Sequence, residues 1–96
     1  MLKIVTVCGN GIGSSLMLKM KIEAIAKENN IPVSVEPSDS NAATGKDCDL
    51  FVTVKEFASI FKPNQRVAIT RSYMNVKKIT EDVLPILIEL NEAKGE

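Results

Sequence analysis

Two kinds of hydrophobic pattern alternate along this chain of 96 residues. Short apolar runs rich in β-branched residues are typical of buried or half-buried strands. Longer segments, in which apolar residues recur every three or four positions, are typical of helices that pack on one face. The pattern predicts strands over residues 2–7, 32–36, 50–54 and 66–70, and helices over 14–29, 56–61 and 76–91, with a short helical turn inside the polar stretch 37–45.

The regular alternation of strands and helices predicts an α/β fold, with a parallel sheet and helices on both of its faces. Pro32 and the alternation of Val33 and Val35 with polar residues favour an edge position for the second strand. Pro85 lies inside the last helical segment, where it either kinks one helix or marks the first turn of a shorter helix that begins near Asp82. Ligands of such folds bind beyond the carboxyl ends of the strands, so the residues that follow each strand are the first candidates for a site.

The segment after the first strand is the richest in chemistry: Val-Thr-Val-Cys-Gly-Asn-Gly-Ile-Gly-Ser-Ser, residues 5–15. Glycine and asparagine permit backbone conformations that turn successive N–H groups toward one point. A serine at position 14 or 15 can cap the following helix, whose N-terminus attracts anions. These features favour a thiolate at Cys8 that carries a phosphoryl group, with a phosphate-binding loop made of Gly9, Asn10, Gly11, Ile12, Gly13, Ser14 and Ser15. The simpler alternative is a tight strand-to-helix turn in which Cys8 is a small buried hydrophobic residue.

Related motifs do not fit this segment. It lacks the Lys of a Walker A loop, the third glycine of a dinucleotide fingerprint and the second Cys of a redox C-x-x-C motif. The phosphatase loop C-x5-R-[S/T] comes nearer, but Ser14 stands where its Arg would clamp the transferring group. The pattern therefore favours a phosphoryl carrier. A small cysteine-dependent phosphatase or arsenate-reductase-like enzyme, and a non-catalytic regulator, remain alternatives.

The amino-acid composition limits the kinds of partner that the protein can bind. Twelve basic and twelve acidic residues give no net charge, which argues against nucleic acid and against a polybasic membrane anchor. No apolar run approaches the roughly 20 residues that span a bilayer, and Met1 leads directly into a strand without a signal peptide, so we expect a cytoplasmic protein with reduced thiols. The chain has no histidine, so any phosphohistidine donor must be another protein, and we expect neither a metal site nor a cofactor. Cys48 is interpreted as a half-buried bystander whose acidic neighbours raise its pKa.

Two further features lie near the predicted site. Lys55 and the loop 71–75 follow the third and fourth strands, so they should lie on the same edge of the sheet as Cys8. Arg71 there either screens a phosphoryl charge or is a solvated surface residue. The first helix carries a core stripe of Leu18, Ile22 and Ile25 and a second stripe of Met17, Met20 and Ala24, which either docks partners or is itself covered.

The sequence Cys8-Gly-Asn-Gly-Ile-Gly-Ser-Ser, followed by Met17 and Lys19-Met20-Lys21, resembles the IIB component of the bacterial sugar phosphotransferase system. The ascorbate-specific type is nearest, and the galactitol type comes next. The similarity is specific over residues 4–22 and continues loosely to the C-terminus, through Val-Ala-Ile-Thr-Arg71.

This resemblance implies a single domain, 1–96, with a four-stranded parallel sheet of order 2-1-3-4 flanked by helices. It implies that Cys8 is a phosphocysteine, which receives its phosphoryl group from a phosphohistidine of a IIA partner. The group then passes to a sugar or sugar acid, L-ascorbate for the nearest type, held by a membrane IIC partner with which the protein associates peripherally. Met17, Met20 and Arg71 are the candidate docking residues.

Overall fold

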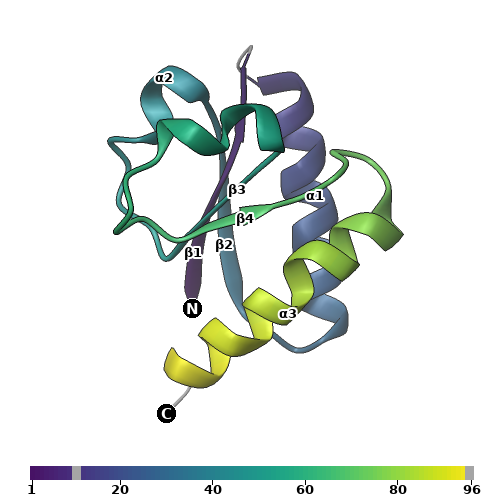
Figure 1. The fold of residues 1–96 in the computed structure, drawn as a ribbon. Coiled ribbons are helices and arrows are strands. Elements are labelled where there is room, and N and C mark those ends of the chain that lie inside the picture. Colours follow the sequence, from purple (N-terminus) through teal and green to yellow (C-terminus); the bar gives the residue numbers. More distant parts are fainter. Residues whose placement is uncertain (10–11, 95–96) are drawn as a thin grey trace.

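The computed structural model describes residues 1–9 and 12–94, and its elements follow the predicted order (Figure 1). All strand pairs are parallel, and the strand order is β2-β1-β3-β4, so the predicted α/β fold and topology are confirmed. The elements are β1 (Leu2–Cys8), α1 (Ile12–Glu28), β2 (Val33–Asp39), α2 (Ser40–Ala43), β3 (Leu50–Thr53), the 3-10 helix η1 (Lys55–Ile60), β4 (Val67–Ile69) and α3 (Val76–Lys94).

Alternation along β1 divides the core between the two faces of the sheet. Leu2 and Ile4 belong to the larger cluster, which α1 and α3 cover with Leu18, Ile22, Ile79, Val83 and Leu87. Val5 and Val7 point to the other face, into a smaller cluster with Ala43 of α2, Phe51 and Phe61. Figure 1 shows the two long helices on one side of the sheet and the short α2 and η1 on the other. Helices on both faces were therefore predicted correctly, but the cover is unequal.

The start of α1 differs from the prediction, and the structure decides between the two interpretations of Pro85. Helix α1 begins at Ile12, so Ser14 and Ser15 lie in its first turn and neither is the residue that caps it. A serine fits the first turn as well as the cap, and the sequence did not distinguish the two positions. Helix α3 runs without interruption from Val76 to Lys94 through Pro85, which excludes a shorter helix that begins near Asp82. The amide oxygen of Asn75 accepts from Lys78 N at 3.1 Å and caps this helix instead.

The end of α1 was predicted correctly at the Asn29-Asn30 pair. Asn30 has a positive φ of 59°, a conformation that asparagine tolerates better than most residues. Its N–H donates to Lys27 O at 3.2 Å, and Ile31 N donates to Ala26 O at 2.9 Å. These two bonds form the Schellman motif, which ends the helix and turns the chain into β2.

Strand β2 lies at one edge of the sheet and is longer than predicted. It pairs with β1 from Leu2↔Val33 to Cys8↔Asp39, and it includes Pro37 opposite Thr6. Proline has no N–H to donate, so it is tolerated in a strand only where the missing N–H faces away from the neighbouring strand. The other edge is β4, of only three residues. Within residues 1–9 and 12–94, no helix is both long and apolar enough to cross a membrane.

Candidate phosphoryl-transfer site

The carboxyl end of the sheet is the polar end of the protein interior. Five polar residues are buried among the described ones, and all lie within two residues of the carboxyl end of a strand or on the first turn of α1: Thr6, Ser15, Ser38, Thr53 and Thr70. No buried side-chain nitrogen or oxygen in the described part of the chain lacks a hydrogen-bond partner. Buried hydroxyl groups are costly unless they are hydrogen-bonded, and a fully bonded set holds the surrounding backbone rigidly, so this edge of the sheet is the first place to look for a site.

Cys8 is the last residue of the inner strand β1, and only 5% of its surface is exposed. By the alternation of β1, its side chain shares the face of Ile4 and Thr6, which is the face covered by α1. Cys8 borders an open hollow of about 530 Å³, together with Gly9, Gly13, Ser14, Ser40, Glu56, Phe57 and Tyr73. The structure thus brings together the thiol and three of the predicted loop residues. Ser15 is buried behind them, while Asn10, Gly11 and the side chain of Ile12 lie outside the described residues.

A buried hydrogen bond fixes the start of α1 beside Cys8. Thr6 Oγ1 donates to the carbonyl oxygen of Ser15 at 2.8 Å and ties the first turn of the helix to β1. Because α1 begins at Ile12, the backbone N–H groups of Gly13 and Ser14 belong to the first turn, whose N–H groups find no acceptor within the helix. Such groups, with the positive end of the helix dipole, suit an anion bonded to the Cys8 sulfur.

Gly9 allows close contact between this loop and η1. A Cβ atom at position 9 would lie 2.6 Å from Cζ of Phe57, well inside van der Waals contact. The Phe57 ring therefore lies directly over the backbone that follows Cys8. The 3-10 helix η1 follows β3 and begins at Lys55, the residue that was expected on this edge of the sheet. The residues of η1 that line the hollow are Glu56 and Phe57, and Lys55 does not line it.

Tyr73 is a site residue that the sequence analysis did not identify. It lies in the loop after β4, yet its hydroxyl donates to the carbonyl oxygen of Val7 at 3.1 Å, across the end of β3. Thr53 Oγ1 donates to the same oxygen, also at 3.1 Å. Burial raises the pKa of the Tyr73 phenol, and the nearby Cys8 and Glu56 groups raise it further. A hydrogen bond with Thr53 lowers it in part, and the net shift is upward, so the hydroxyl is a donor near neutral pH. The sequence could have pointed to Tyr73 through its position, because it lies in the loop 71–75, which was expected on the same edge of the sheet as Cys8.

The charges around the hollow are unusual for an anion site. Among its lining residues Glu56 is the one charged side chain, and neither Lys nor Arg lines it in the described part of the chain. Arg71 is turned toward α3, where its Nε lies 3.1 Å from Asp82 Oδ2 and a terminal guanidinium nitrogen lies 2.7 Å from Glu81 Oε1. The Arg71 hydrogen bonds hold the pKa of Asp82 below its usual range. Arg71 thus fixes the base of the loop that carries Tyr73, and it does not line the hollow.

Cys48 is separate from this site. Its half-buried thiol donates to Leu50 O at 3.4 Å and packs against the smaller core cluster. Burial raises the pKa of this thiol, and Asp49 and Asp47 add to the effect, in the predicted direction. Cys8 and Cys48 are not joined by a disulfide. No group of three or more potential metal ligands occurs among residues 1–9 and 12–94.

The two apolar stripes of α1 differ in how far they are buried. Leu18, Ile22 and Ile25 are buried as predicted. On the second stripe, Met17 is half-buried and Met20 is 58% exposed, so this stripe is not covered along its length by the described part of the chain.

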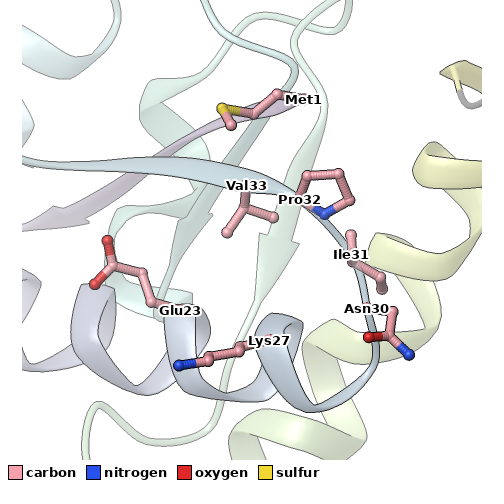
Figure 2. A pocket seen from close by; sticks show the side chains of 7 residues that line it. All are labelled: Met1, Glu23, Lys27, Asn30, Ile31, Pro32 and Val33. Carbon is pink, nitrogen blue, oxygen red and sulfur yellow. The ribbon is translucent and has the colours of Figure 1, made fainter.

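A second hollow lies at the opposite end of the sheet (Figure 2). Glu23 and Lys27 of α1 form one wall, and Met1 and Val33, at the starts of β1 and β2, form the other. It contains no thiol, and it lies at the amino ends of the strands, away from the edge where ligands of this kind of sheet bind. We therefore place the candidate site at Cys8.

Two comparisons with known proteins bear on this geometry. The family model described as "PTS system, Lactose/Cellobiose specific IIB subunit" matches residues 3–82. The "Ascorbate-specific PTS system EIIB component" of Mycoplasma pneumoniae (strain ATCC 29342 / M129 / Subtype 1) is 33% identical over 70 residues, which cover 71% of this chain and 74% of that protein. The matched family segment includes both Cys8 and Tyr73.

Proposed function

Because this chain belongs to the IIB family of sugar phosphotransferase-system subunits, we propose that Cys8 is its phosphoryl carrier. One observation supports this assignment above the others. The thiol lies at the carboxyl end of an inner strand, in a hollow that the first turn of α1 also borders. The thiol is the nucleophile, and the N–H groups of that turn stabilise the charge that develops on the phosphoryl oxygens.

The transfer has two balanced steps. The Cys8 thiolate attacks the phosphorus of a phosphohistidine on the IIA partner, the S–P bond forms as the N–P bond breaks, and the electron pair of that bond stays on the imidazole nitrogen. In the second step a hydroxyl group of the sugar attacks the same phosphorus and gives its proton to a base of the IIC partner or to solvent, while the S–P bond breaks and its electron pair restores the thiolate. Charge spreads over the equatorial oxygens in both steps, so positioning and backbone donors are the contribution expected of the protein.

The donor and the acceptor both lie on other proteins. The chain has no histidine, so the phosphohistidine is assigned to IIA. The sugar is assigned to a membrane IIC partner, to which this protein binds peripherally from the cytoplasm. The name of the Mycoplasma relative supports L-ascorbate as the sugar. We assign the exposed part of the Met17–Met20 stripe to partner docking. Arg71, which follows the carboxyl end of β4 and pairs with Glu81 and Asp82, is the further docking candidate.

Phosphorylation mapping tests the carrier role. The protein is incubated with phosphorylated IIA, and the adduct is located by mass spectrometry under conditions that preserve thiophosphates. We expect one phosphoryl group, on Cys8, that is absent from Cys8→Ser and unchanged in Cys48→Ser. Phosphate on Cys48, or normal labelling of Cys8→Ser, would contradict the proposal.

A phosphatase role is the main alternative, and the charges of the site argue against it. The described lining of the hollow contains no guanidinium group to clamp the transferring oxygens during hydrolysis. Purified phosphoprotein should therefore persist without an acceptor, and hydrolysis of aryl phosphates or reduction of arsenate should be negligible. Rapid turnover of either substrate by the wild-type protein would favour the enzyme alternative.

A further inference from the structure

The Val7 carbonyl oxygen, next to Cys8 in the chain, receives two side-chain hydrogen bonds. Tyr73 and Thr53 each donate to it at 3.1 Å. The β1–β3 ladder ends one residue earlier, at Thr6↔Val52, so these hydroxyl groups continue the pairing beyond the last backbone partners. Since one donor is enough to satisfy a buried carbonyl, Tyr73 can leave without exposing an unsatisfied acceptor.

Tyr73 also borders the hollow in which a phosphoryl group on Cys8 would lie. A phosphoryl group offers charged oxygens, which bind a hydroxyl donor more strongly than a neutral carbonyl does. No cationic side chain in the described lining competes with Tyr73 for these oxygens, and Arg71 is held by Asp82 and Glu81.

We propose that the Tyr73 hydroxyl exchanges the Val7 carbonyl for a phosphoryl oxygen when Cys8 is phosphorylated, while Thr53 keeps the carbonyl bonded. Tyr73 is then a phosphoryl-contacting residue that acts in place of the missing arginine and stabilises the phosphocysteine. This inference rests on the proposed carrier role of Cys8. It explains why a loop two strands away in the sheet order reaches the end of β1.

The first test needs no partner protein. In a Cys48→Ala background, sulfite and tetrathionate convert Cys8 to its S-sulfonate, which places a tetrahedral anion on the sulfur. The free energy of unfolding in urea is then compared between the Cys48→Ala protein and the same protein with Tyr73→Phe, each with and without the S-sulfonate on Cys8. Phenylalanine keeps the ring and removes only the hydroxyl, so the cycle isolates the contact between hydroxyl and anion.

We expect Tyr73→Phe to reduce the unfolding free energy only slightly in the unmodified protein, because Thr53 still satisfies Val7. With the anion present, the same change should lower the folding equilibrium constant by about tenfold more, as expected for a hydrogen bond to a charged group. Thr53→Val should diminish this coupling, since Tyr73 would then be the remaining side-chain donor to Val7. Equal effects of Tyr73→Phe in both forms would overturn the proposal.

A spectroscopic measurement covers the case in which Tyr73→Phe fails to fold. Tyr73 is the one tyrosine of the chain, which has no tryptophan, so phenolate absorbance near 295 nm reports this residue alone. S-sulfonation of Cys8 should raise the pKa of Tyr73, and the rise should persist at about 1 M salt, where charges more than about 3 Å apart are largely screened. A pKa that is unchanged at high salt would refute the contact.

Phosphotransfer supplies the last test and separates the two proposals. At equilibrium with phosphorylated IIA, Tyr73→Phe should hold about tenfold less phosphoryl group relative to IIA than the wild type does. If the wild type never acquires phosphate, the carrier role fails, while the S-sulfonate cycle still decides the role of Tyr73. If the wild type is phosphorylated and Tyr73→Phe matches it, the carrier role stands and the Tyr73 contact is wrong.

Discussion

Met20 provides the sharpest test of where partners dock. It is 58% exposed on α1, and with a rise of about 1.5 Å per residue it lies about 9 Å along the helix from Ser14 at the site. A partner that brings its own active site to Cys8 must cover this distance. We therefore expect Met20→Glu to impair phosphoryl transfer from IIA while the protein stays folded.

The exposure of Met20 limits the cost to stability. Less than half of its surface is covered, and complete burial of such a side chain is worth about 1.5–3 kcal/mol, so the substitution should cost at most about 1 kcal/mol. In a domain of this size that lowers the melting temperature by no more than about 4–8 °C. An apolar residue near the centre of an interface is worth about 1–2 kcal/mol, which corresponds to a roughly five- to thirtyfold slower transfer at limiting IIA.

The assay measures transfer rates against IIA concentration, together with thermal melting. Met20→Gln separates the loss of apolar surface from the added charge. Ala24→Glu places the same charge on an exposed position one turn further from the site. Met17→Glu, at a half-buried position, should lose more stability than Met20→Glu. If Met20→Glu and Met17→Glu both unfold, the stripe belongs to the core. If Met20→Glu transfers normally, the docking face lies elsewhere on this edge, and the loop 71–75 is the next candidate.

Four other changes test parts of the structure separately. Thr6→Val removes the buried bond to the start of α1 and should cost about 1 kcal/mol in urea unfolding, because the shape is kept and the donor is lost; an unchanged midpoint would contradict this reasoning. Asn30→Ala should destabilise by about 1 kcal/mol, whereas Asn30→Gly should be neutral or stabilising, since the φ of 59° favours glycine. Asp82→Asn should lower the free energy of unfolding at pH 7, because the ion pair of Asp82 with Arg71 contributes fully above the unfolded pKa of about 4. The difference between the two proteins should disappear as the pH falls through the lowered folded-state pKa of Asp82, where the carboxylate is protonated. A difference that persists in strong acid would refute this role of the ion pair. Gly9→Ala should displace the Phe57 ring and slow transfer, and Phe57→Leu should partly restore the rate of the Gly9→Ala protein.

The fold could be predicted from local sequence patterns, because the strands are short apolar runs and the long helices have apolar residues every three or four positions. Strand β1 and helix α1 are adjacent in the chain, so the thiol and its loop were visible as one motif. The start of α1 was misplaced because serine fits both a cap and a first turn. Pro85 left two interpretations open, a longer helix or a shorter one that begins near Asp82. The structure shows one helix, Val76–Lys94, whose Ile79, Val83 and Leu87 all pack into the same core.

The rest of the site depends on tertiary contacts that no local pattern encodes. Tyr73, Glu56 and Phe57 come from loops after β3 and β4, and their side-chain directions are fixed only when the sheet has formed. The sequence placed the loop 71–75 on the correct edge but directed attention to Arg71, since a cation is the expected partner of a phosphoryl group. In the structure the carboxylates of α3 bind that cation, and the neutral neighbour Tyr73 reaches Val7.

The edges of the sheet have a consequence for behaviour at high concentration. An exposed strand edge is a template on which a second copy can add its own strand and begin to aggregate. Strand β4 offers only three residues for such pairing, and β2 carries Pro37, which has no N–H to donate, beside the charged Glu36. Both edges therefore resist growth of the sheet from chain to chain. A protein that meets its partners at the strand ends can remain dispersed while that surface stays open to them.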